Sequence, residues 1–571
     1  MSEAGTVPES FRQTARTALD VLLECDPAAA TALGDHRFDR RLPDVSPTGV
    51  QRRLSDLADA TGALDDLDES QLDLQDRVDL EMLRTRLTAR TWALGELAEQ
   101  TWDPLGTLPG AAIYPLVARD TGDPDERALA VLARLAAVPA YLEAVRAQLG
   151  EMPQVHVETA VLQTRGAVSL LGEPVDALVA RTTAPLPGLD DARSAAATAL
   201  EQHAGWLADR LPECHRDPRL GERAFAARLW YSLDTATGPD ALLDRAESDL
   251  MAVEDQIAEV AARLAPLLGV QEPGLTRVRA VLDALAAGAL VTDATVLDRC
   301  RSHLDDLTAL VREHDLVSVP DDAVEVIEMP QARRGVAVAY CDPPGPLEAD
   351  LPGGGPPPTF FAVAPTPDGW SEQQVASFYR EYNDHMLRNL TVHEAMPGHV
   401  LQLAHARRFR GSTPVRSALR SGTFVEGWAV YAERAVVELC ERLEPGSVTA
   451  LGQRMQQLKM QLRCTINAIL DVRVHSRRMT EAEAITLMVE RGHQEEGEAT
   501  GKWRRALLTS GQLSTYYVGC TEVSALADQL RAVRPQHSDR ALHDELLSHG
   551  SPPPRLLAGL VGAEAGSEEQ A

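Results

Sequence analysis

The chain has 571 residues, of which 44% are hydrophobic and 25% are charged, a composition typical of a soluble globular protein with a large core. Its formal net charge of -30 disfavours binding to nucleic acid, because a phosphate backbone would meet a repulsive field. No uninterrupted apolar run approaches the roughly 20 residues needed to span a bilayer. We therefore expect neither a nucleic-acid nor a membrane partner.

The first residues, MSEAGTVPES, contain no basic segment followed by an apolar stretch, so nothing in them predicts secretion. The seven cysteines are scattered singly and form no CxxC pair, which is typical of reduced thiols in a reducing compartment. Both observations predict a cytoplasmic location.

Residues 1–320 read as successive helices, with leucines and small apolar residues at steps of three and four. The clearest of these helices follows Pro239, in a place where a first turn tolerates proline. Its predicted buried face consists of Leu243, Ala246, Leu250, Val253, Ile257, Val260 and Leu264. Because the repeat covers only about three heptads, we favour a core seam in a bundle over a partner-binding coiled coil.

Between Asp321 and Pro365 the apolar period changes from helical to alternating, which predicts short strands. The expected strand residues are Val324 and Val326, then Val336, Val338 and Tyr340, then Thr359 to Val363. A run rich in proline and glycine at 342–358 interrupts them and predicts an exposed loop. Two interpretations of this loop stay open: a flap over a cleft, and a surface excursion without a role.

Helices resume at Ser371, which with Gln374 forms the pattern of a capping box for a helix running toward Leu390. The chain ends at 551–571 in SPPPRLLAGLVGAEAGSEEQA, whose last residues are small and acidic. This composition predicts a flexible tail.

The segment HEAMPGH, residues 393–399, places two histidines around a glutamate. A catalytic zinc needs three nitrogen or oxygen ligands, one open position and a carboxylate that takes a proton from bound water. His393 and His399 are six residues apart, which on an ideal helix separates them by about 120°. Pro397 and Gly398 can interrupt the helix and return His399 toward the metal, because proline clashes with the carbonyl of His393 and glycine permits unusual torsions.

A third ligand is expected from an acid on a neighbouring helix. Glu426 lies 27 positions after His399 (426 minus 399), which leaves room for the first helix to end, a turn and an antiparallel return. Glu433 follows on nearly the same helical face and is expected to hydrogen-bond a ligand histidine. Glu394 would then be the general base that passes the proton to a leaving amine.

Each of these residues also has a structural explanation. Thr391 and Glu394 match a capping box, and Glu426 and Glu433 could be ordinary solvated acids. Taken jointly, the two histidines, the adjacent glutamate, the Pro-Gly break and the later acid favour a metal site. His405 lies in a regular helical segment without an acid beside it and is not favoured as a ligand.

HEAMPGH followed by EGWAVYAE resembles the pattern of the bacterial domain of unknown function family 885. The similarity runs from GDHRFDRRLPD at 34–44 nearly to the end of the chain. Members of this family resemble zinc metallopeptidases of the gluzincin type. The resemblance implies a mainly α, zincin-like fold with a small β element near the active site. It also implies Zn²⁺ bound by His393, His399 and Glu426, with Glu394 as the base.

The family also tends to carry an Asp-x-Gly-x-His segment, and a Pro-Gly-Gln segment followed by a tyrosine. This chain has DVRVH at 471–475 and SGQLSTYYVG at 510–519, which keep Asp471, His475, Gln512 and Tyr516. The resemblance implies that His475 and Tyr516 donate hydrogen bonds to the oxyanion formed when water attacks a carbonyl. The alternatives are a core histidine and a packed aromatic.

Two departures from the family pattern concern the substrate side. Arg473 stands where the family usually has glycine, and Ser510 replaces proline. Arg473 could bind a substrate carboxylate, or it could be solvated on a helix face. The predicted ligands are intact, so activity is easier to predict than specificity.

We predict a helical amino-terminal lobe at 1–320, a catalytic lobe at 321–550 and a flexible tail at 551–571. The predicted activity is zinc-dependent hydrolysis of an amide bond in a small peptide or peptide-like metabolite, in a cleft between the lobes. A metal-dependent esterase or acyl hydrolase is one alternative. A non-catalytic helical binding protein with a structural or vestigial metal site is another. The sequence leaves the natural substrate and the oligomeric state open.

Overall fold

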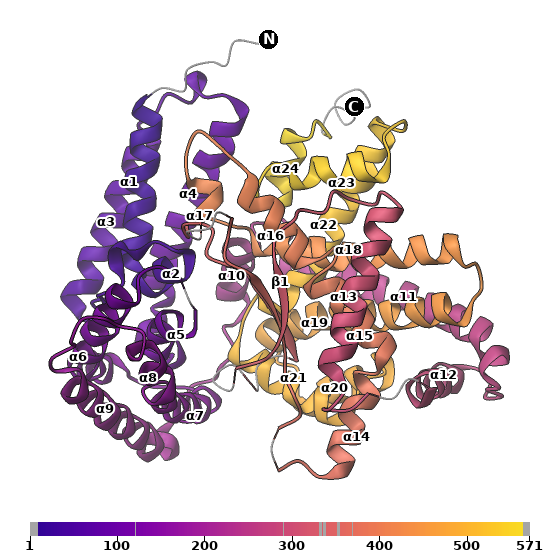
Figure 1. The fold of residues 1–571 in the computed structure, drawn as a ribbon, viewed down its shortest axis with the longest axis horizontal. Helices are drawn as coiled ribbons and strands as arrows, with labels where there is room; N and C mark the ends of the chain where they lie inside the picture. Colours follow the sequence, from indigo (N-terminus) through magenta and orange to yellow (C-terminus); the bar gives the residue numbers. More distant parts are fainter. Residues whose placement is uncertain are drawn as a thin grey trace. The chain divides into compact units, whose positions relative to one another are not determined.

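The protein is mainly α-helical with a small three-stranded sheet among its described residues (Figure 1). The computed structural model describes residues 9–119, 121–288, 291–330, 334, 338–350, 355–367 and 369–563. The chain divides into two compact units. Unit 1 comprises residues 1–218, 344–357 and 410–419, and unit 2 comprises residues 219–343, 358–409 and 420–571.

Unit 1 consists of helices packed around apolar cores, with α1 beside α3 and α6 beside α9. Its α-helices are α1 (Glu9–Cys25), α2 (Pro27–Leu33), α3 (Pro47–Asp65), α4 (Leu74–Trp92), α5 (Gly110–Ala118), α6 (Pro124–Gln148), α7 (Gln154–Leu170), α8 (Glu173–Val179), α9 (Leu189–Arg210) and α17 (Val415–Ala418). Its short helical turns are η1 (His36–Phe38), η2 (Glu69–Gln71), η3 (Ala93–Leu97), η4 (Glu99–Thr101), η5 (Leu105–Thr107) and η6 (Leu211–Glu213).

Among the described helices, α6 has the length and apolar composition that would allow it to cross a membrane. In the fold, 44% of its apolar window is buried, and Leu135, Val138 and Leu142 lie in the core of unit 1. Arg134 is fully buried on the same helix and donates to the backbone carbonyls of Arg41 and Pro27. Because its apolar face and its arginine both have partners within unit 1, packing in a helical core accounts for its composition.

The predicted loop at 342–358 contributes residues 344–357 to unit 1. There the Leu347 amide donates to the Leu33 carbonyl over 2.8 Å, and the Glu348 carboxylate lies 3.2 Å from the His36 ring. The described part of this segment is therefore packed against α2 and η1 rather than simply exposed. Residues 351–354 lie outside the described residues.

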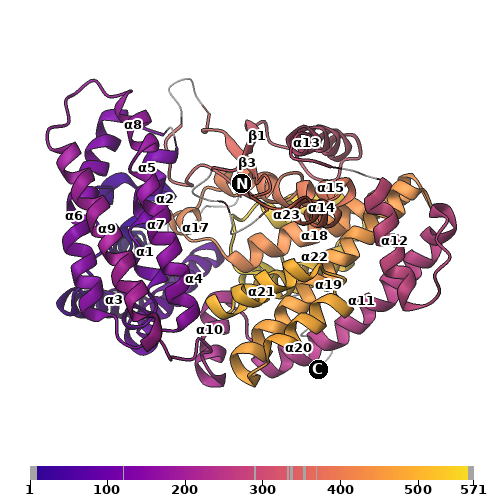
Figure 2. The same cartoon turned by 90° about the horizontal axis from the view of Figure 1, so that it is seen from below.

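Unit 2 contains a layer of long helices, in which α18 (Gly422–Leu443), α22 (Gln512–Val533), α19 (Val448–Arg477) and α11 (Pro239–Leu268) lie one beside the next (Figure 2). The long helix predicted after Pro239 is confirmed as α11. Its predicted face is buried from Ala246 to Leu264, and Leu243 is partly buried at its edge. The seam packs against α19, which makes it part of a core, as predicted.

The remaining elements of unit 2 surround this layer and the sheet. They are α10 (Glu222–Leu233), α12 (Leu275–Gly288), α13 (Val296–Glu313), α14 (Glu372–Glu381), α15 (Asp384–Glu394), α16 (His399–Arg408), α20 (Glu481–Thr486), η8 (Leu487–Arg491), α21 (Glu496–Leu508), α23 (Asp539–Leu547) and α24 (Pro554–Leu560).

The observed division differs from the predicted lobe boundaries. Residues 219–320 belong to unit 2 instead of the amino-terminal lobe, because α11 buries its apolar face against α19. Residues 551–563 are packed in unit 2 instead of forming a tail: Leu557 and Val561 are fully buried, and the Ser551 carbonyl accepts from the Ser421 amide over 2.8 Å. The rest of the predicted tail, 564–571, lies outside the described residues.

The sheet has the strand order β1-β3-β2. β1 (Val324–Glu328) pairs in parallel with β3 (Thr359–Val363), and β2 (Ala339–Asp342) pairs with β3 in the antiparallel sense. The predicted strands are confirmed in outline, although Val338 precedes β2 and Val336 lies outside the described residues. Phe361 and Val363 are buried in one core with residues of α15, which fixes the sheet beside that helix.

The predicted capping box of Ser371 and Gln374 is present at the start of α14. The helix ends at Glu381 instead of running on toward Leu390. The physical reason is a second cap: the Asn383 side chain accepts from the backbone amide of Met386 and starts α15 as a new helix.

Candidate metal centre

The HEAMPGH segment forms a break between α15 and α16, at the place where the sequence predicts one. The Gly398 amide donates to the Val392 carbonyl over 2.9 Å. A Cβ at this glycine would lie 1.9 Å from the carbonyl oxygen of His393, so only glycine fits. From α18, the Trp428 indole N–H donates to the Pro397 carbonyl over 2.9 Å. The break is thus encoded locally by Pro-Gly and held in place by a neighbouring helix.

The break brings three of the predicted residues together: His393, His399 and Glu426. Their ligand atoms all lie within 4.8 Å of one another. Oε2 of Glu426 is 3.5 Å from Nε2 of His393 and 3.4 Å from Nε2 of His399. The two imidazole rings meet edge to face, with centroids 4.8 Å apart. Two elements of the broken helix and one turn of α18 therefore converge on one position.

Glu433 fixes the orientation of the His393 ring. Nδ1 of His393 donates to Oε1 of Glu433 over 2.8 Å, and the Asn389 side chain donates to Oε2 of Glu433 over 2.6 Å. Glu433 is only 1% exposed, so this network is sheltered from water. A neutral His393 with its proton on Nδ1 directs the lone pair of Nε2 toward Glu426, as a metal ligand must.

The donor set fits a zinc ion. Tetrahedral ligands at zinc distances lie about 3.4 Å from one another, close to the 3.4 and 3.5 Å that separate Glu426 from the two ring nitrogens. Oε2 of Glu426 is buried and, within the described structure, has no partner in hydrogen-bonding geometry. An orphaned buried carboxylate oxygen facing two imidazole nitrogens is what a cation position would contain.

Protons and a metal would compete for this position. Burial lowers the pKa of His393, but the adjacent carboxylates of Glu426 and Glu433 raise it well above its ordinary value. Burial raises the pKa of Glu426, but the two histidines, His399 first, lower it well below its ordinary value. The carboxylate of Glu426 is therefore ionised at neutral pH and attracts whichever cation is present.

Glu394, the predicted base, is buried next to the cluster. Its Oε2 accepts from the backbone amide of Cys341 on β2 over 2.9 Å. Burial raises the pKa of the Glu394 carboxyl, and the charges of His393 and His399 oppose this shift. The sheet thus orients this carboxylate through an amide of a strand. Thr391 lies inside α15 with its hydroxyl on the Leu387 carbonyl, so the alternative capping box does not form.

Tyr516 on α22 lies beside the cluster, with its ring centroid 6.5 Å from that of His393. The charge of Glu426 and burial raise the pKa of its hydroxyl, so the hydroxyl stays protonated and can donate. Close packing of α22 on α18 places it there. A Cβ on Gly427 would lie 2.4 Å from the backbone of Gly519, so the two helices cross at a glycine pair.

The structure places His475 and Asp471 in a different network. Nε2 of His475 lies 2.8 Å from the Thr509 carbonyl and 3.0 Å from the Ala506 carbonyl, and its Nδ1 accepts from the Leu220 amide over 3.4 Å. Neither ring nitrogen is available to a substrate. The catalytic role implied for His475 therefore has no geometric basis here. Its ring hydrogen-bonds to backbone groups, which agrees with the alternative of a core histidine.

Asp471 caps the start of α22. Its carboxylate accepts from the backbone amides of Gly511 and Ser514 over 3.1 and 3.0 Å, and from the Ser514 hydroxyl over 2.8 Å. Asp471 and His475 together fix the turn between α21 and α22. Tyr516 lies in the second turn of α22, directly after this point. Asp471 and His475 position the site without reaching it.

The other two candidates have partners elsewhere. Arg473 forms an ion pair with Glu247 of α11. Arg473 is not one of the clustered residues, so no observation supports its suggested contact with a substrate carboxylate. His405 places Nε2 2.7 Å from the Ser318 carbonyl and is not among the clustered ligands.

Sequence reasoning missed several residues that shape the site. Asn389 precedes His393 by one helical turn, and Trp428 follows Glu426 by two residues, so inspection of spacing around the motif could have found both. The Cys341 amide could not be found in this way, because a backbone group 53 positions away leaves no signal in the sequence.

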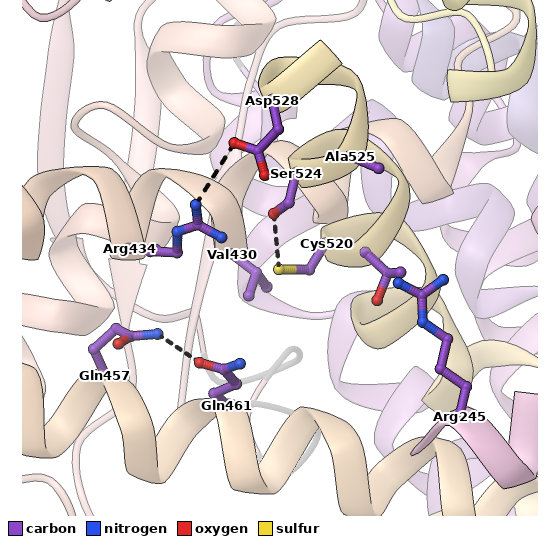
Figure 3. Close-up of a pocket in the computed structure, with 10 residues that line it drawn as sticks. Arg245, Val430, Arg434, Gln457, Gln461, Cys520, Ser524, Ala525 and Asp528 are labelled. Atoms are coloured by element: carbon purple, nitrogen blue, oxygen red, sulfur yellow. Dashed lines mark hydrogen bonds and ion pairs between the residues drawn. The ribbon is translucent and has the colours of Figure 1, made fainter. Parts of the chain in front are cut away.

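A cavity of about 270 Å³ lies between α11, α18, α19 and α22 (Figure 3). Its lining residues are Arg245, Val430, Arg434, Gln457, Gln461, Cys520, Thr521, Ser524, Ala525 and Asp528. None of the three clustered ligands lines it, and Arg434 lies 3.9 Å from Asp528 at its wall. The cavity is separate from the candidate metal centre.

Comparison with solved structures shows that the fold recurs in two other bacterial proteins. The first is described as "a putative lipoprotein of unknown function from Shewanella oneidensis". It is 26% identical, with a TM-score of 0.81 over 96% of this chain and 99% of that chain. The second is described as "the putative lipoprotein from Colwellia psychrerythraea". It is 16% identical, with a TM-score of 0.77 over 97% of this chain and 98% of that chain, and shows the fold alone.

The chain matches no curated protein. A family model described as "Bacterial protein of unknown function (DUF885)" matches residues 27–561. The match contains the helix break, the converging residues and nearly all of both units. The protein therefore belongs to the DUF885 family.

Proposed function

We propose that the protein is a zinc-dependent hydrolase of the zincin-like type that cleaves an amide bond in a small peptide or peptide-like metabolite. One observation carries the proposal: two imidazole nitrogens lie 3.5 and 3.4 Å from one buried carboxylate oxygen. The buried Glu394 beside them supports a catalytic centre over a structural one, because a structural zinc uses four protein ligands and needs no base.

His393, His399 and Glu426 would hold the zinc ion, and Glu433 would keep the His393 ring in its binding tautomer. When bound, zinc supplies a Lewis acid that polarises a carbonyl group and lowers the pKa of a water molecule. Glu394 takes the proton of the attacking water and delivers it to the leaving amine. The Cys341 amide holds this carboxylate at one oxygen and leaves the other free for the proton.

Tyr516 would donate its hydroxyl proton as a hydrogen bond to the carbonyl oxygen as negative charge develops there. Its raised pKa keeps the proton on the phenol at neutral pH. Arg505 donates to the same phenolic oxygen over 3.5 Å, which leaves the phenolic proton free to point at a substrate.

The expected partner is a small peptide-like substrate, with neither nucleic acid nor membrane. The cytoplasmic location stays a prediction, and the lipoprotein descriptions of the two structural relatives give a reason to test it. Cell fractionation with an antibody against the protein, with lipid labelling in parallel, distinguishes a cytoplasmic protein from a lipid-anchored one.

The function is tested by metal content and turnover together. Wild-type protein should contain about one zinc per chain, and His399→Ala and Glu426→Ala should lose it. Glu394→Gln should retain zinc while turnover on a panel of peptides, N-acyl amino acids and esters falls about 10²- to 10⁴-fold.

Stoichiometric zinc in both ligand variants would end the metal assignment. Equal turnover by wild type and Glu394→Gln would show that another group is the base. A zinc-loaded wild type that is inert toward the whole panel would favour the binding-protein alternative, and selective cleavage of the esters would favour an acyl hydrolase.

A further inference from the structure

Arg505 lies beside the candidate metal centre and forms no ion pair among the described residues. It is partly buried near the end of α21. Its Nε donates to Oε1 of Gln512 over 3.3 Å, and its Nη2 donates to the hydroxyl oxygen of Tyr516 over 3.5 Å. Among the described residues no carboxylate forms an ion pair with it; Glu498 on the same helix is paired with Arg463. The printed hydrogen bonds of the guanidinium thus go to neutral groups, while the charge of Glu498 acts on it without a direct ion pair.

The contacts of Arg505 leave most of its binding capacity unused. A guanidinium has five N–H donors, and two are used here, by Gln512 and Tyr516, so three are left. Both distances are at the long end of the range for hydrogen bonds. The ligand that best matches a planar cation with several free donors is a carboxylate bound through two parallel hydrogen bonds.

The distance from Tyr516 selects which carboxylate this would be. In a peptide, the carbonyl carbon of the scissile amide and the carboxyl carbon of the next residue are separated by three covalent bonds, roughly 3–4 Å. Nη2 of Arg505 lies 3.5 Å from the Tyr516 hydroxyl, which is the group proposed to meet the scissile carbonyl oxygen. Because the two donors are in contact, the groups that they bind must also be close together, and the carboxylate of the next residue is near enough to the scissile carbonyl to meet this condition.

We propose that Arg505 binds the free α-carboxylate of the residue that follows the scissile bond. The substrates are then peptides or N-acyl amino acids that lose their last residue, and the enzyme cleaves from the carboxyl end. This inference rests on the proposed hydrolase function. It replaces Arg473, whose guanidinium is paired with Glu247, as the carboxylate-binding arginine.

The test uses matched N-acyl dipeptides that end in a free carboxylate or in a carboxamide. Zinc-loaded wild type should prefer the acid about 10- to 100-fold in kcat/KM. A preference of this size corresponds to the free energy of one hydrogen bond to a charged group. Arg505→Gln should lose this preference because it slows cleavage of the acid more than cleavage of the amide, whose rate reports only the contact of Arg505 with Tyr516. Arg505→Lys keeps the charge and should retain part of the preference. Arg504→Gln, on the adjacent position, is the matched control and should keep all of it.

Binding measured without turnover gives a second readout. On the Glu394→Gln background, calorimetry should show tighter binding of the acid than of the amide, and adding Arg505→Gln should remove the difference. Equal cleavage of acid and amide by wild type, or equal losses on both in Arg505→Gln, would overturn the proposal and leave Arg505 as a support for Tyr516. If neither dipeptide is cleaved but the acid still binds through Arg505, the hydrolase function fails and the carboxylate site stands.

Discussion

Two groups of buried histidines and carboxylates lie in unit 2, and they differ in what their polar atoms contact. In the first, Oε2 of Glu426 lies 3.5 Å from Nε2 of His393 and 3.4 Å from Nε2 of His399. In the second, Asp471 accepts three hydrogen bonds and both ring nitrogens of His475 meet backbone groups. In the first group the Oε2 atom of Glu426 has no hydrogen-bond partner among the described residues. In the second group both carboxylate oxygens and both ring nitrogens have one.

The difference teaches that burial and residue type do not identify a ligand. Both groups come from segments that resemble the family pattern, and both contain a histidine in a helical core. What distinguishes them is the partner of each lone pair. A buried histidine whose two nitrogens hydrogen-bond to backbone groups has a structural role. A buried histidine whose remaining lone pair faces a carboxylate indicates a cation-binding site.

The largest expected effect separates the two histidines directly. His393→Ala removes a ligand and should reduce zinc from about one per chain to nearly none. His475→Ala should keep the zinc and lower the free energy of unfolding, because it leaves the Leu220 amide and the turn carbonyls without a partner. Metal analysis by mass spectrometry and denaturant titration measure the two effects. Loss of zinc from both variants would remove the distinction.

The next effect concerns Tyr516. Tyr516→Phe should keep zinc and stability while kcat falls about 10²- to 10³-fold, as expected when one donor to an oxyanion is removed. Tyr517→Phe is the control, because its hydroxyl donates to Asp249 of α11 over 2.6 Å in a partly buried hydrogen bond. Steady-state kinetics should therefore show the loss only in the first variant. A comparable loss in both would point to a disturbed helix α22.

A smaller effect is expected at the carboxylates behind the histidines. Glu433→Gln weakens the hydrogen bond that orients His393 and should reduce zinc affinity about 10- to 100-fold. Asp471→Asn should leave zinc affinity unchanged, because that carboxylate serves the turn before α22. Competition with a chromogenic chelator measures both. Equal affinities for Glu433→Gln and wild type would show that the His393 ring needs no support.

The smallest effect is on folding. Asp471→Asn removes a charged acceptor from two amides and a hydroxyl and should lower the free energy of unfolding by about 1–3 kcal/mol. Asp528→Asn is the control on α22, since its carboxylate is 58% exposed and its ion pairs are worth little. Urea unfolding followed by circular dichroism should separate them. A stable Asp471→Asn protein would show that the turn does not depend on this cap.

Much of the helical architecture could be predicted from periodicity. The buried face of α11 and the capping box at Ser371 both depend on residues close together in the sequence, so local patterns contain them. The end of α14 was missed because the competing cap at Asn383 lies within a segment that otherwise reads as helical. The lobe boundary was missed because the pairing of α11 with α19 joins segments about two hundred residues apart, which leaves no local signal.

By itself, the sequence determined that the helix must break at Pro397 and Gly398 and that two histidines and a glutamate stand around this break. These are local properties of backbone torsion and residue type. Only the tertiary structure decided that Glu426 faces both rings, that His475 holds a turn and that Arg505 donates to Tyr516. The physical reason is that a lone pair or a charge acquires its role from the atoms packed against it, and those atoms come from distant parts of the chain.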